Sequence, residues 1–250
     1  MRVCHRTHQG LVRASNQDSL LAEGRLYGVA DGMGGHKGGE TASRVAVQVV
    51  KNALSRKKPE EDALRMGLEA ANRRVYGMAG SDENLTGMGT TMTLLWEGER
   101  RILIGHVGDT RVYRISDQHI RVVTEDQTVV VREVQQGRLT PEEAEADPRR
   151  SVLLQCIGAS RIVEPVYYSG RVVPDECWLL CSDGFRHEIS AQEIQEALRP
   201  ESNRSEADME HHLRTLVETD KDRMEQDNIS AILIRTVKGE LGHGGYWADH

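Results

Sequence analysis

Hydrophobic positions in the first half of the chain change between strand-like runs and helical spacing. Short strand-like runs occupy residues 11–12 and 26–30. Apolar residues then recur at the spacing of one helix face over 42–53 and again over 64–78, which predicts two amphipathic helices. Pro59 and the three acidic residues after it suit the start of the second helix, because a helix N-terminus tolerates proline and favours negative charge. Strand-like patterns return over 90–96, 101–107, 111–115 and 120–123.

Two later apolar runs, at 178–181 and 229–234, are each long enough for a buried central strand. Residues 190–198 and 205–217 lie between them and have helical patterns, and Ser190 with Glu193 fits a capping box. Strands therefore dominate and helices are inserted in pairs. This order predicts an α+β fold in which two sheets pack on each other and helices cover them from outside. No linker or change in composition divides the chain, so we expect one domain, with the polar segment 127–147 as a peripheral insertion.

Charge and composition exclude several classes of protein. The 250 residues include 32 Lys+Arg and 39 Asp+Glu, which gives a net charge of -7. This acidic balance argues against nucleic-acid binding, which depends on basic patches. No stretch approaches the roughly 18 consecutive apolar residues of a membrane span, and the first ten residues lack the apolar segment of a secretory signal. We therefore expect a cytoplasmic location and no membrane span.

The cysteines are too few and too widely spaced to suggest a disulfide scaffold or a zinc site. There are four, Cys4, Cys156, Cys177 and Cys181, and none forms a CxxC pair, so we expect reduced and buried thiols. Cys177 and Cys181 would lie on one face of a strand about 13 Å apart, too far to share a zinc ion.

Aspartates fall at the ends of the predicted strands. Asp31 follows the strand at 26–30, Asp183 follows the run ending at 182, and Asp227 precedes 229–234. Asp18 precedes another apolar pair, and Asp109 lies between two strands. Carboxylates at strand ends can converge on one edge of a sheet, where only divalent cations would offset their mutual repulsion. Oxygen ligands without a His/Cys cluster favour Mg²⁺ or Mn²⁺.

The segment after the first buried strand is rich in glycine. An isolated Asp-Gly pair is common in turns, but residues 31–40 carry five glycines between a strand and a helix. Such a loop lets the backbone approach an ion or a phosphate closely. Its spacing fits neither a P-loop nor a dinucleotide-binding loop, because Lys37 stands where the latter has its last glycine.

Six short segments, taken in order, resemble the metal-dependent Ser/Thr protein phosphatases of the PPM (type 2C) class in their compact bacterial form. Residues 13–19 resemble the R-x-x-N-x-D motif, 29–35 the V-x-D-G-M-G-G loop, and 87–91 a G-T-T strand start. Residues 106–111 are similar to the V-G-D-S-R segment with Thr110 for Ser, and 182–184 and 227–228 resemble the S-D-G and D-N motifs. Each motif alone is weak, whereas six in family order are highly specific.

The resemblance implies a four-layer αββα sandwich with a two-metal centre at the edge of the sheets. Residues 1–238 would form one catalytic domain with a flap-like insertion at about 127–150, and 239–250 a short tail. Asp31 would bridge two Mn²⁺ or Mg²⁺ ions, and the Gly32 carbonyl would help to hold one of them. Asp183 and Asp227 would complete the other site, and Asp18 would contact metal-bound water. By the same resemblance, Asp109 with Asp183 would serve a third, weaker site, and Arg13 would hold the substrate phosphate.

The residues themselves agree with these implied roles. Two cations about 3.5–4 Å apart can lower the pKa of a shared water and present hydroxide for in-line attack on phosphorus. A planar and permanently charged guanidinium can grip two phosphate oxygens at once, which suits Arg13.

The chain departs from the family pattern at two positions. Met33 stands where some relatives have a histidine proposed as the general acid, which leaves His36 as the nearest candidate for that role or as a plain loop residue. Gln127 replaces a histidine in the segment 124–127, so we expect Asp126 to order the wall of the cleft rather than to take part in the chemistry.

The sequence therefore predicts a monomeric protein serine/threonine phosphatase that acts on phosphorylated proteins and opposes a bacterial Ser/Thr kinase. Two alternatives remain open at this point. One is a phosphatase-like regulatory module without catalysis, against which the retention of five aspartates and Arg13 argues. The other is a two-metal hydrolase of different substrates. The acidic composition argues against a nuclease, and nothing argues strongly against small phosphate esters.

Overall fold

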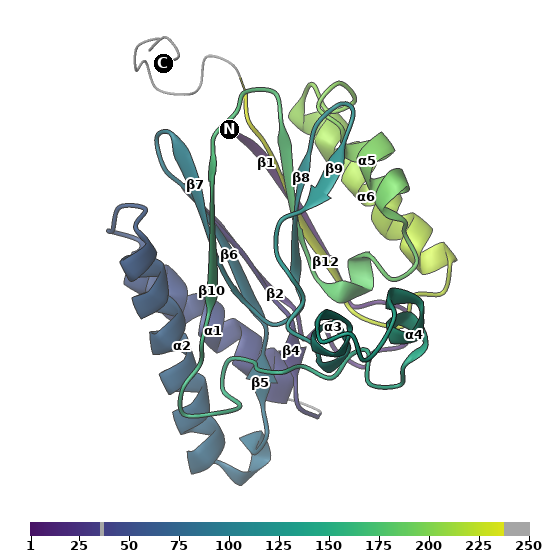
Figure 1. Ribbon diagram of the computed structural model, residues 1–250. Helices are drawn as coiled ribbons and strands as arrows, with labels where there is room; N and C mark the ends of the chain where they lie inside the picture. Colours follow the sequence, from purple (N-terminus) through teal and green to yellow (C-terminus); the bar gives the residue numbers. More distant parts are fainter. Residues whose placement is uncertain (36–37, 238–250) are drawn as a thin grey trace.

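Two five-stranded antiparallel sheets form the centre of the molecule, described here by a computed structural model for residues 1–35 and 38–237 (Figure 1). The first sheet has the order β1 (Arg2–His8), β12 (Ile229–Arg235), β11 (Cys177–Cys181), β8 (Arg111–Ile115) and β9 (Ile120–Val122). The second has the order β10 (Val166–Arg171), β7 (Arg101–Val107), β6 (Met92–Glu97), β3 (Leu26–Ala30) and β2 (Ser19–Glu23). The short strands β4 (Gly32–Met33) and β5 (Gly89–Thr90) pair with each other.

A pair of helices covers the outer face of each sheet (Figure 1). The helices α1 (Gly38–Leu54) and α2 (Glu61–Ser81) pack on the second sheet, and α5 (Ala191–Leu198) and α6 (Glu206–Asp222) pack on the first. The predicted capping box at the start of α5 is present, since Ser190 Oγ accepts the N–H of Glu193 and the Glu193 carboxylate accepts the N–H of Ser190. There are also two short 3₁₀ turns among the described residues, η1 (Glu83–Leu85) after α2 and η2 (Asp183–Phe185) after β11. The predicted αββα sandwich is confirmed.

Three hydrophobic layers hold the sandwich together. Alternate residues of β11 point to opposite faces, so Trp178 and Leu180 fill the space between the sheets while Leu179 packs under α5 and α6. The strand β12 alternates in the same way. Because both faces of these central strands are covered, their sequences read as unbroken apolar runs. The four cysteines are free and buried, as expected.

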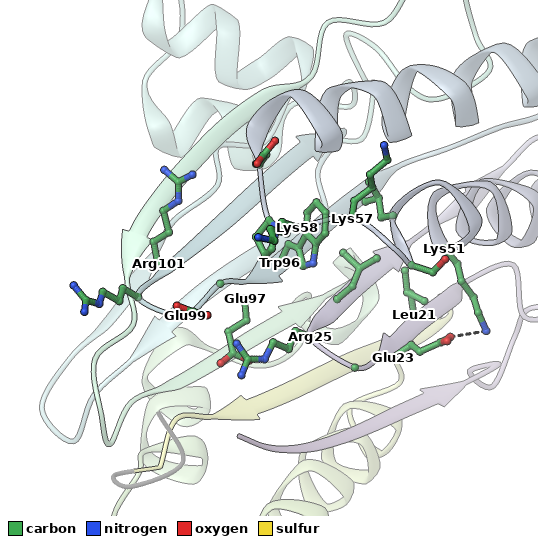
Figure 2. A pocket seen from close by; sticks show the side chains of 18 residues that line it. Leu21, Glu23, Arg25, Lys51, Lys57, Lys58, Trp96, Glu97, Glu99 and Arg101 are labelled. Carbon is green, nitrogen blue, oxygen red and sulfur yellow. Dashed lines mark ion pairs between the residues drawn. The ribbon is translucent and has the colours of Figure 1, made fainter. Parts of the chain in front are cut away.

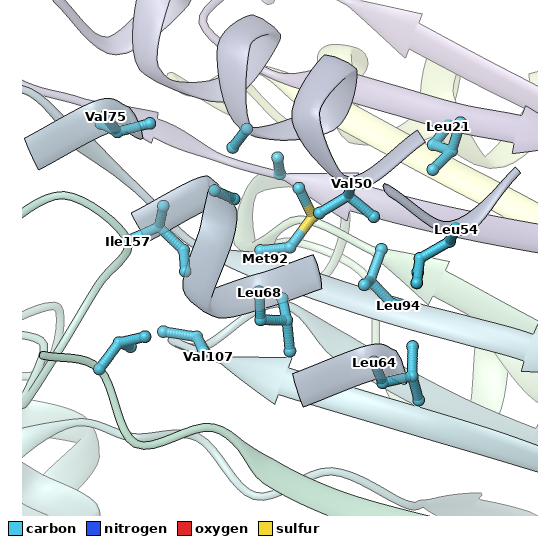
Figure 3. Close-up of a cluster of buried hydrophobic side chains, with 14 of the residues drawn as sticks. Leu21, Val50, Leu54, Leu64, Leu68, Val75, Met92, Leu94, Val107 and Ile157 are labelled. Atoms are coloured by element: carbon cyan, nitrogen blue, oxygen red, sulfur yellow. The ribbon is translucent and has the colours of Figure 1, made fainter. Parts of the chain in front are cut away.

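The third layer lies between α1, α2 and the second sheet (Figure 3). Val50 and Leu54 of α1 and Leu64 and Leu68 of α2 meet Leu94 of β6 there. Each of these side chains is at most 3% exposed, and burying a leucine stabilises a fold by about 1.5–3 kcal/mol. The predicted apolar stripe is the buried face of α2. In α1 the fully buried face is shifted by about one residue, to Val50 and Leu54, and the predicted positions beside them are partly buried.

Three edge strands of the two five-stranded sheets were not predicted, and one predicted strand is wrong. Residues 11–12 lie in an exposed loop, with Leu11 53% and Val12 64% exposed, whereas the first strand is β1. The missed strands are β1, β2 and β10, and each borders only one neighbour. An edge strand has a partly solvated surface, so its sequence mixes arginine, histidine or serine with apolar residues and loses a clear period.

The polar segment expected as an insertion forms two short helices, α3 (Val129–Gln135) and α4 (Pro141–Ala146). Thr128 caps α3 through its Oγ1, which accepts the N–H of Val131, and Thr140 forms a capping box with Glu143. Val130 is buried, whereas α4 has no buried residue. Residues of both helices line a small cavity together with Asp109, Arg111 and Arg186, so this segment lies at one end of the sandwich and is held by few apolar contacts (Figure 1). The predicted tail lies outside the described residues. Within those residues, no helix has both the length and the apolarity that crossing a bilayer would need.

Candidate functional site

Two cavities lie at opposite ends of the second sheet. The larger, of about 810 Å³, is bordered by the β2–β3 turn, the β6–β7 turn and the connection from α1 to α2 (Figure 2). Trp96 and Leu21 contribute apolar surface to it, and Lys51 pairs with Glu23 at its edge, with Nζ and Oε2 2.5 Å apart. None of the predicted site residues lines this cavity. Its size alone does not make it the centre of chemistry.

The smaller cavity, of about 440 Å³, brings most of the predicted site residues together. Its lining includes Arg13, Asp31, Gly32, Asp109, Asp183 and Asp227. Asp18 is 9% exposed and lies close enough for its charge to raise the pKa of Asp31. His36, the predicted general acid, lies outside the described residues.

Each of the five aspartates comes from a different loop. Asp31 follows β3, Asp109 lies between β7 and β8, and Asp18 precedes β2. Asp183 opens η2 two residues after the end of β11, and Asp227 stands two residues before β12. The two sheets therefore both contribute carboxylates, and these meet at one edge of the sandwich, as the positions at strand ends predicted.

Backbone hydrogen bonds fix the Asp31–Gly32 segment. The N–H of Asp31 donates to Thr91 Oγ1 at 2.9 Å, and the N–H of Thr91 donates back to the Asp31 carbonyl at 2.8 Å. The N–H of Gly32 donates to the carbonyl of Gln17 at 3.2 Å. A Cβ on Gly32 would lie 2.2 Å from the carbonyl oxygen of Gly39, so only glycine fits here. The close approach of these chains sets the direction of the Asp31 carboxylate and the Gly32 carbonyl.

Asn228 organises the loop that carries Arg13 and Asp18. Its Nδ2 donates to the carbonyls of Gln9 and Ser15 at 2.7 and 3.1 Å, and its Oδ1 accepts the N–H of Gln17 at 2.8 Å. The motif comparison named Asn228 but gave it no role. An amide has both the donor and the acceptor that these three backbone groups need, which explains why asparagine suits position 228. In the sequence, the only signal for this role was that Asn228 follows Asp227.

The ends of β11 and β12 are packed tightly at the site. A Cβ on Gly184 would lie 2.3 Å from the carbonyl oxygen of Asn228. Glycine in the S-D-G segment therefore lets the loop of Asp183 approach the loop of Asp227, which brings the two carboxylates to the same cavity.

Burial and mutual repulsion shift the titration of these acids. Burial, with the charges of Asp183 and Asp227, raises the pKa of Asp18 to about 7. Neither Asp18 oxygen has a hydrogen-bond partner of good geometry among the described residues, although the hydroxyls of Ser230 and Ser182 are near enough to oppose this rise. Burial, followed by the charge of Asp183, also raises the pKa of Asp109 to about 7, and burial raises the pKa of Asp31 well above its ordinary value. A cation bound among these carboxylates would therefore offset their burial and their mutual repulsion.

The donor set fits hard divalent cations. All the candidate ligands are oxygen atoms, and both oxygens of Asp18 and Oδ1 of Asp183 are buried without a partner among the described residues. In the part of the chain that the structure describes, no three acidic, histidine or cysteine side chains form a closed ligand set for one ion. Mg²⁺ and similar ions keep several waters and are usually bound by one or two carboxylates, so an open arrangement of this kind suits them.

Arg13 lies at the rim of the same cavity. Its Nη2 donates to Asp227 Oδ2 at 2.6 Å, and its side chain is 52% exposed. The predicted phosphate-binding group and a predicted metal ligand are therefore direct neighbours.

Asp126 holds two arginines on the wall towards α3 and α4. Its carboxylate accepts two bonds from Arg111, from Nε at 2.8 Å and from Nη2 at 2.7 Å, and one from Arg186 Nη2 at 3.2 Å. Arg186 also donates to the Asp109 carbonyl at 3.3 Å, and the side chain of Gln127 accepts the N–H of Gly108 at 2.8 Å. These contacts fit the expectation that Asp126 orders the wall of the cleft.

Comparison with known proteins gives consistent matches over most of the chain. Residues 7–233 match the family model for protein phosphatase 2C. The chain is 36% identical over 202 residues to the serine/threonine protein phosphatase PstP of Mycobacterium tuberculosis, which is 80% of this chain but 39% of that protein. It is 31% identical over 212 residues to the serine/threonine phosphatase stp of Listeria monocytogenes, which is 80% of this chain and 84% of that protein.

A solved structure agrees with these sequence matches. The catalytic domain of PstP, crystallised in complex with 2 manganese ions, has a TM-score of 0.83 and 30% identity, with 95% of this chain and 98% of that chain covered. The residues matched by the family model include all six motifs that carried the resemblance. The chain belongs to the protein phosphatase 2C family.

Proposed function

We propose that this chain hydrolyses phosphoserine and phosphothreonine in proteins by a two-metal mechanism that uses Mn²⁺ or Mg²⁺. The observation that carries the proposal is the convergence of five aspartates from five loops. Four of them line one cavity, Asp18 is buried close to them, and burial raises the pKa of three of the five. The membership of the family and the manganese ions in the related PstP structure support it.

In this proposal, the aspartates of the cavity and Gly32 bind the metal ions, and Arg13 binds the substrate. Asp31 would help to hold two ions, the Gly32 carbonyl would help to hold one of them, and Asp183 and Asp227 would complete the other site. Asp18 would contact metal-bound water. When bound, the ions lower the pKa of a water molecule and neutralise charge on the phosphate. Asp109 with Asp183 would hold a third ion.

Arg13 would orient the phosphate. Its guanidinium lies at the cavity rim, is half exposed and reaches the ligand loop through Asp227. A fork of N–H donors can bond two oxygens of a phosphate at once and hold the phosphorus in line for attack. The contact with Asp227 keeps the guanidinium at the rim of the cavity.

Hydrolysis of a phosphothreonine peptide by the purified protein tests this function. We expect turnover with Mn²⁺ or Mg²⁺ and none with a chelator, and Asp183→Asn serves as the matched inactive control. Turnover without metal, or no turnover with any divalent ion, would overturn the proposal. Comparison of the peptide with a small aryl phosphate under the same conditions separates a protein phosphatase from an esterase of small molecules, because only the former gains from the peptide flanking the phosphate.

We also propose the wider assignments that the resemblance suggested. Residues 1–238 would form one catalytic domain in which the helices α3 and α4, within about 127–150, act as a flap beside the cavity. The enzyme would act as a monomer and oppose a Ser/Thr kinase. Four free and buried cysteines support a reducing, cytoplasmic location.

A further inference from the structure

Glu225 lies in the loop that carries Asp227 and is connected to Asp183 through His187. Its side chain is 5% exposed. Its Oε1 accepts the N–H groups of Gln226 and Asp227 at 2.8 and 2.7 Å. Its Oε2 lies 3.3 Å from His187 Nδ1, and His187 Nε2 lies 3.4 Å from Asp183 Oδ2.

The helix α6 ends just before Glu225. Met224 has a φ of 67°, the left-handed conformation in which many helices end. The N–H of Glu225 donates to the carbonyl of Asp220 at 3.1 Å, which closes the end of α6. This cap places Glu225 at the start of the loop that carries Asp227.

We propose that Glu225 and His187 are positioning residues, which link the Asp183 and Asp227 loops and set both carboxylates for a shared divalent cation. This inference rests on the metal centre of the proposed function. One oxygen of Glu225 fixes the backbone at Asp227, and the other fixes the imidazole that lies against Asp183.

Simple electrostatics explains why such a link is needed. The carboxylates of Asp183 and Asp227 repel each other, so each would turn away from the other in the absence of a support. Asp227 already has a competing partner in Arg13. Removal of a group that hydrogen-bonds to a metal ligand commonly lowers metal affinity or activity by about 10–100-fold.

Calorimetric titration of metal-free protein with MnCl₂ tests the link without depending on turnover. Glu225→Gln keeps an amide oxygen for the two N–H groups but removes the negative charge that faces His187, and His187→Ala removes the bridge to Asp183. We expect about 10–100-fold weaker Mn²⁺ binding in each variant. Both substitutions break the same connection between Asp183 and Asp227, so their effects should not multiply. The double variant should bind Mn²⁺ at most about twofold more weakly than the single variant with the lower Mn²⁺ affinity.

Two controls separate positioning from a general loss of structure. Glu218→Gln removes a carboxylate from an exposed part of α6, where Glu218 pairs with Lys221, and should leave Mn²⁺ affinity unchanged. At saturating Mn²⁺, Glu225→Gln should recover most of the wild-type kcat while needing more Mn²⁺ for half of its activity. A folding defect would lower kcat at every concentration of Mn²⁺.

Several outcomes would overturn the inference. These are unchanged Mn²⁺ affinity in Glu225→Gln or His187→Ala, effects that multiply in the double variant, or absence of Mn²⁺ binding to the wild-type protein. If the wild-type protein binds Mn²⁺, the variants weaken it and no phosphopeptide is hydrolysed, the positioning role stands and only the proposed function fails.

Discussion

Arg13 and Asp227 form a direct ion pair at the rim of the cavity, with Nη2 and Oδ2 2.6 Å apart. The residue predicted to bind the substrate phosphate is thus held by a residue predicted to bind a metal. A cation at Asp227 and a phosphate at Arg13 would each weaken this pair, so binding of one prepares the partner group for the other. Substrate and metal binding are expected to be coupled through this contact.

Arg13→Ala should separate phosphate binding from metal binding. Loss of charged hydrogen bonds, each contributing about 1.5–3 kcal/mol, should lower kcat/KM for a phosphothreonine peptide about 10–100-fold, mainly through KM. Mn²⁺ affinity should not fall, because the variant frees Asp227. Steady-state kinetics and Mn²⁺ titration measure the two effects. Arg13→Lys should recover little, since an ammonium group cannot form the two-pronged contact, and Arg73→Ala on the exposed face of α2 is the control. An unchanged KM and kcat would contradict the role of Arg13.

Asp183→Asn should remove nearly all activity and leave the fold intact. The amide keeps the shape of the side chain but lacks the charge that a divalent cation needs, so we expect at least about a 100-fold loss of kcat. Removal of one of several clustered negative charges should not lower the melting temperature of the metal-free protein. Phosphopeptide hydrolysis and calorimetry check both points. Full activity in this variant would show that the aspartate cluster is not the centre of catalysis.

The central strands and the aspartates could be predicted from the sequence because each has a strong local signature. Strands such as β11 and β12 are covered on both faces and read as unbroken apolar runs, and Asp31 and Asp183 follow such runs directly. The edge strands β1 and β10 lack that signature, because solvent covers part of their surface. The apolar pair at 11–12 misled the prediction because two residues cannot establish a period.

Contacts between distant loops could not be predicted in the same way. Asn228 bonds three backbone groups of the loop from Gln9 to Gln17, and Glu225 reaches His187. These side chains have the polar character of ordinary loop residues, and only the folded backbone brings their partners within reach. The resemblance to a family located the ligands, whereas the groups that support the ligands needed the structure.

Mn²⁺ should stabilise the protein, and more strongly at high pH than at low pH. Burial and repulsion raise the pKa of Asp18 and Asp109 to about 7. The folded state then holds protons that the unfolded state has released, so the stability of the metal-free protein should fall as the pH rises from about 4 to 7. Above that range the acids are charged and a cation offsets their repulsion. At 100 times the dissociation constant the gain is about 2.7 kcal/mol.

Differential scanning calorimetry at pH 5 and pH 8, with Mn²⁺ and with chelator, measures this effect. For a chain of this size the gain corresponds to a rise of roughly 5–10 °C in melting temperature at pH 8. Asp183→Asn, with a weakened site, should show a smaller rise. A melting temperature that does not respond to Mn²⁺ at either pH would count against the metal centre.

Asp220 offers a test of buried charge away from the cavity. It lies in α6, is fully buried, and neither of its carboxylate oxygens has a partner among the described residues. Burial, with the nearby charges of Glu225 and Glu188 opposed by His187, raises the pKa of Asp220 to about 7. A raised pKa in the folded state means that the contribution of Asp220 to stability is present at low pH and is lost as the pH rises through about 7.

Asp220→Asn should therefore stabilise the protein at pH 8 and have little effect at pH 4, because the amide resembles the protonated acid. We expect a gain on the order of 2 kcal/mol at pH 8, measured by urea unfolding of the metal-free protein at both pH values. Asp222→Asn, two residues further along α6 and exposed, is the matched control and should change the pH dependence little. If Asp220→Asn destabilised the protein equally at pH 4 and pH 8, the buried carboxylate would have a structural partner that its charged form requires. The repulsion assigned to this carboxylate would then be wrong.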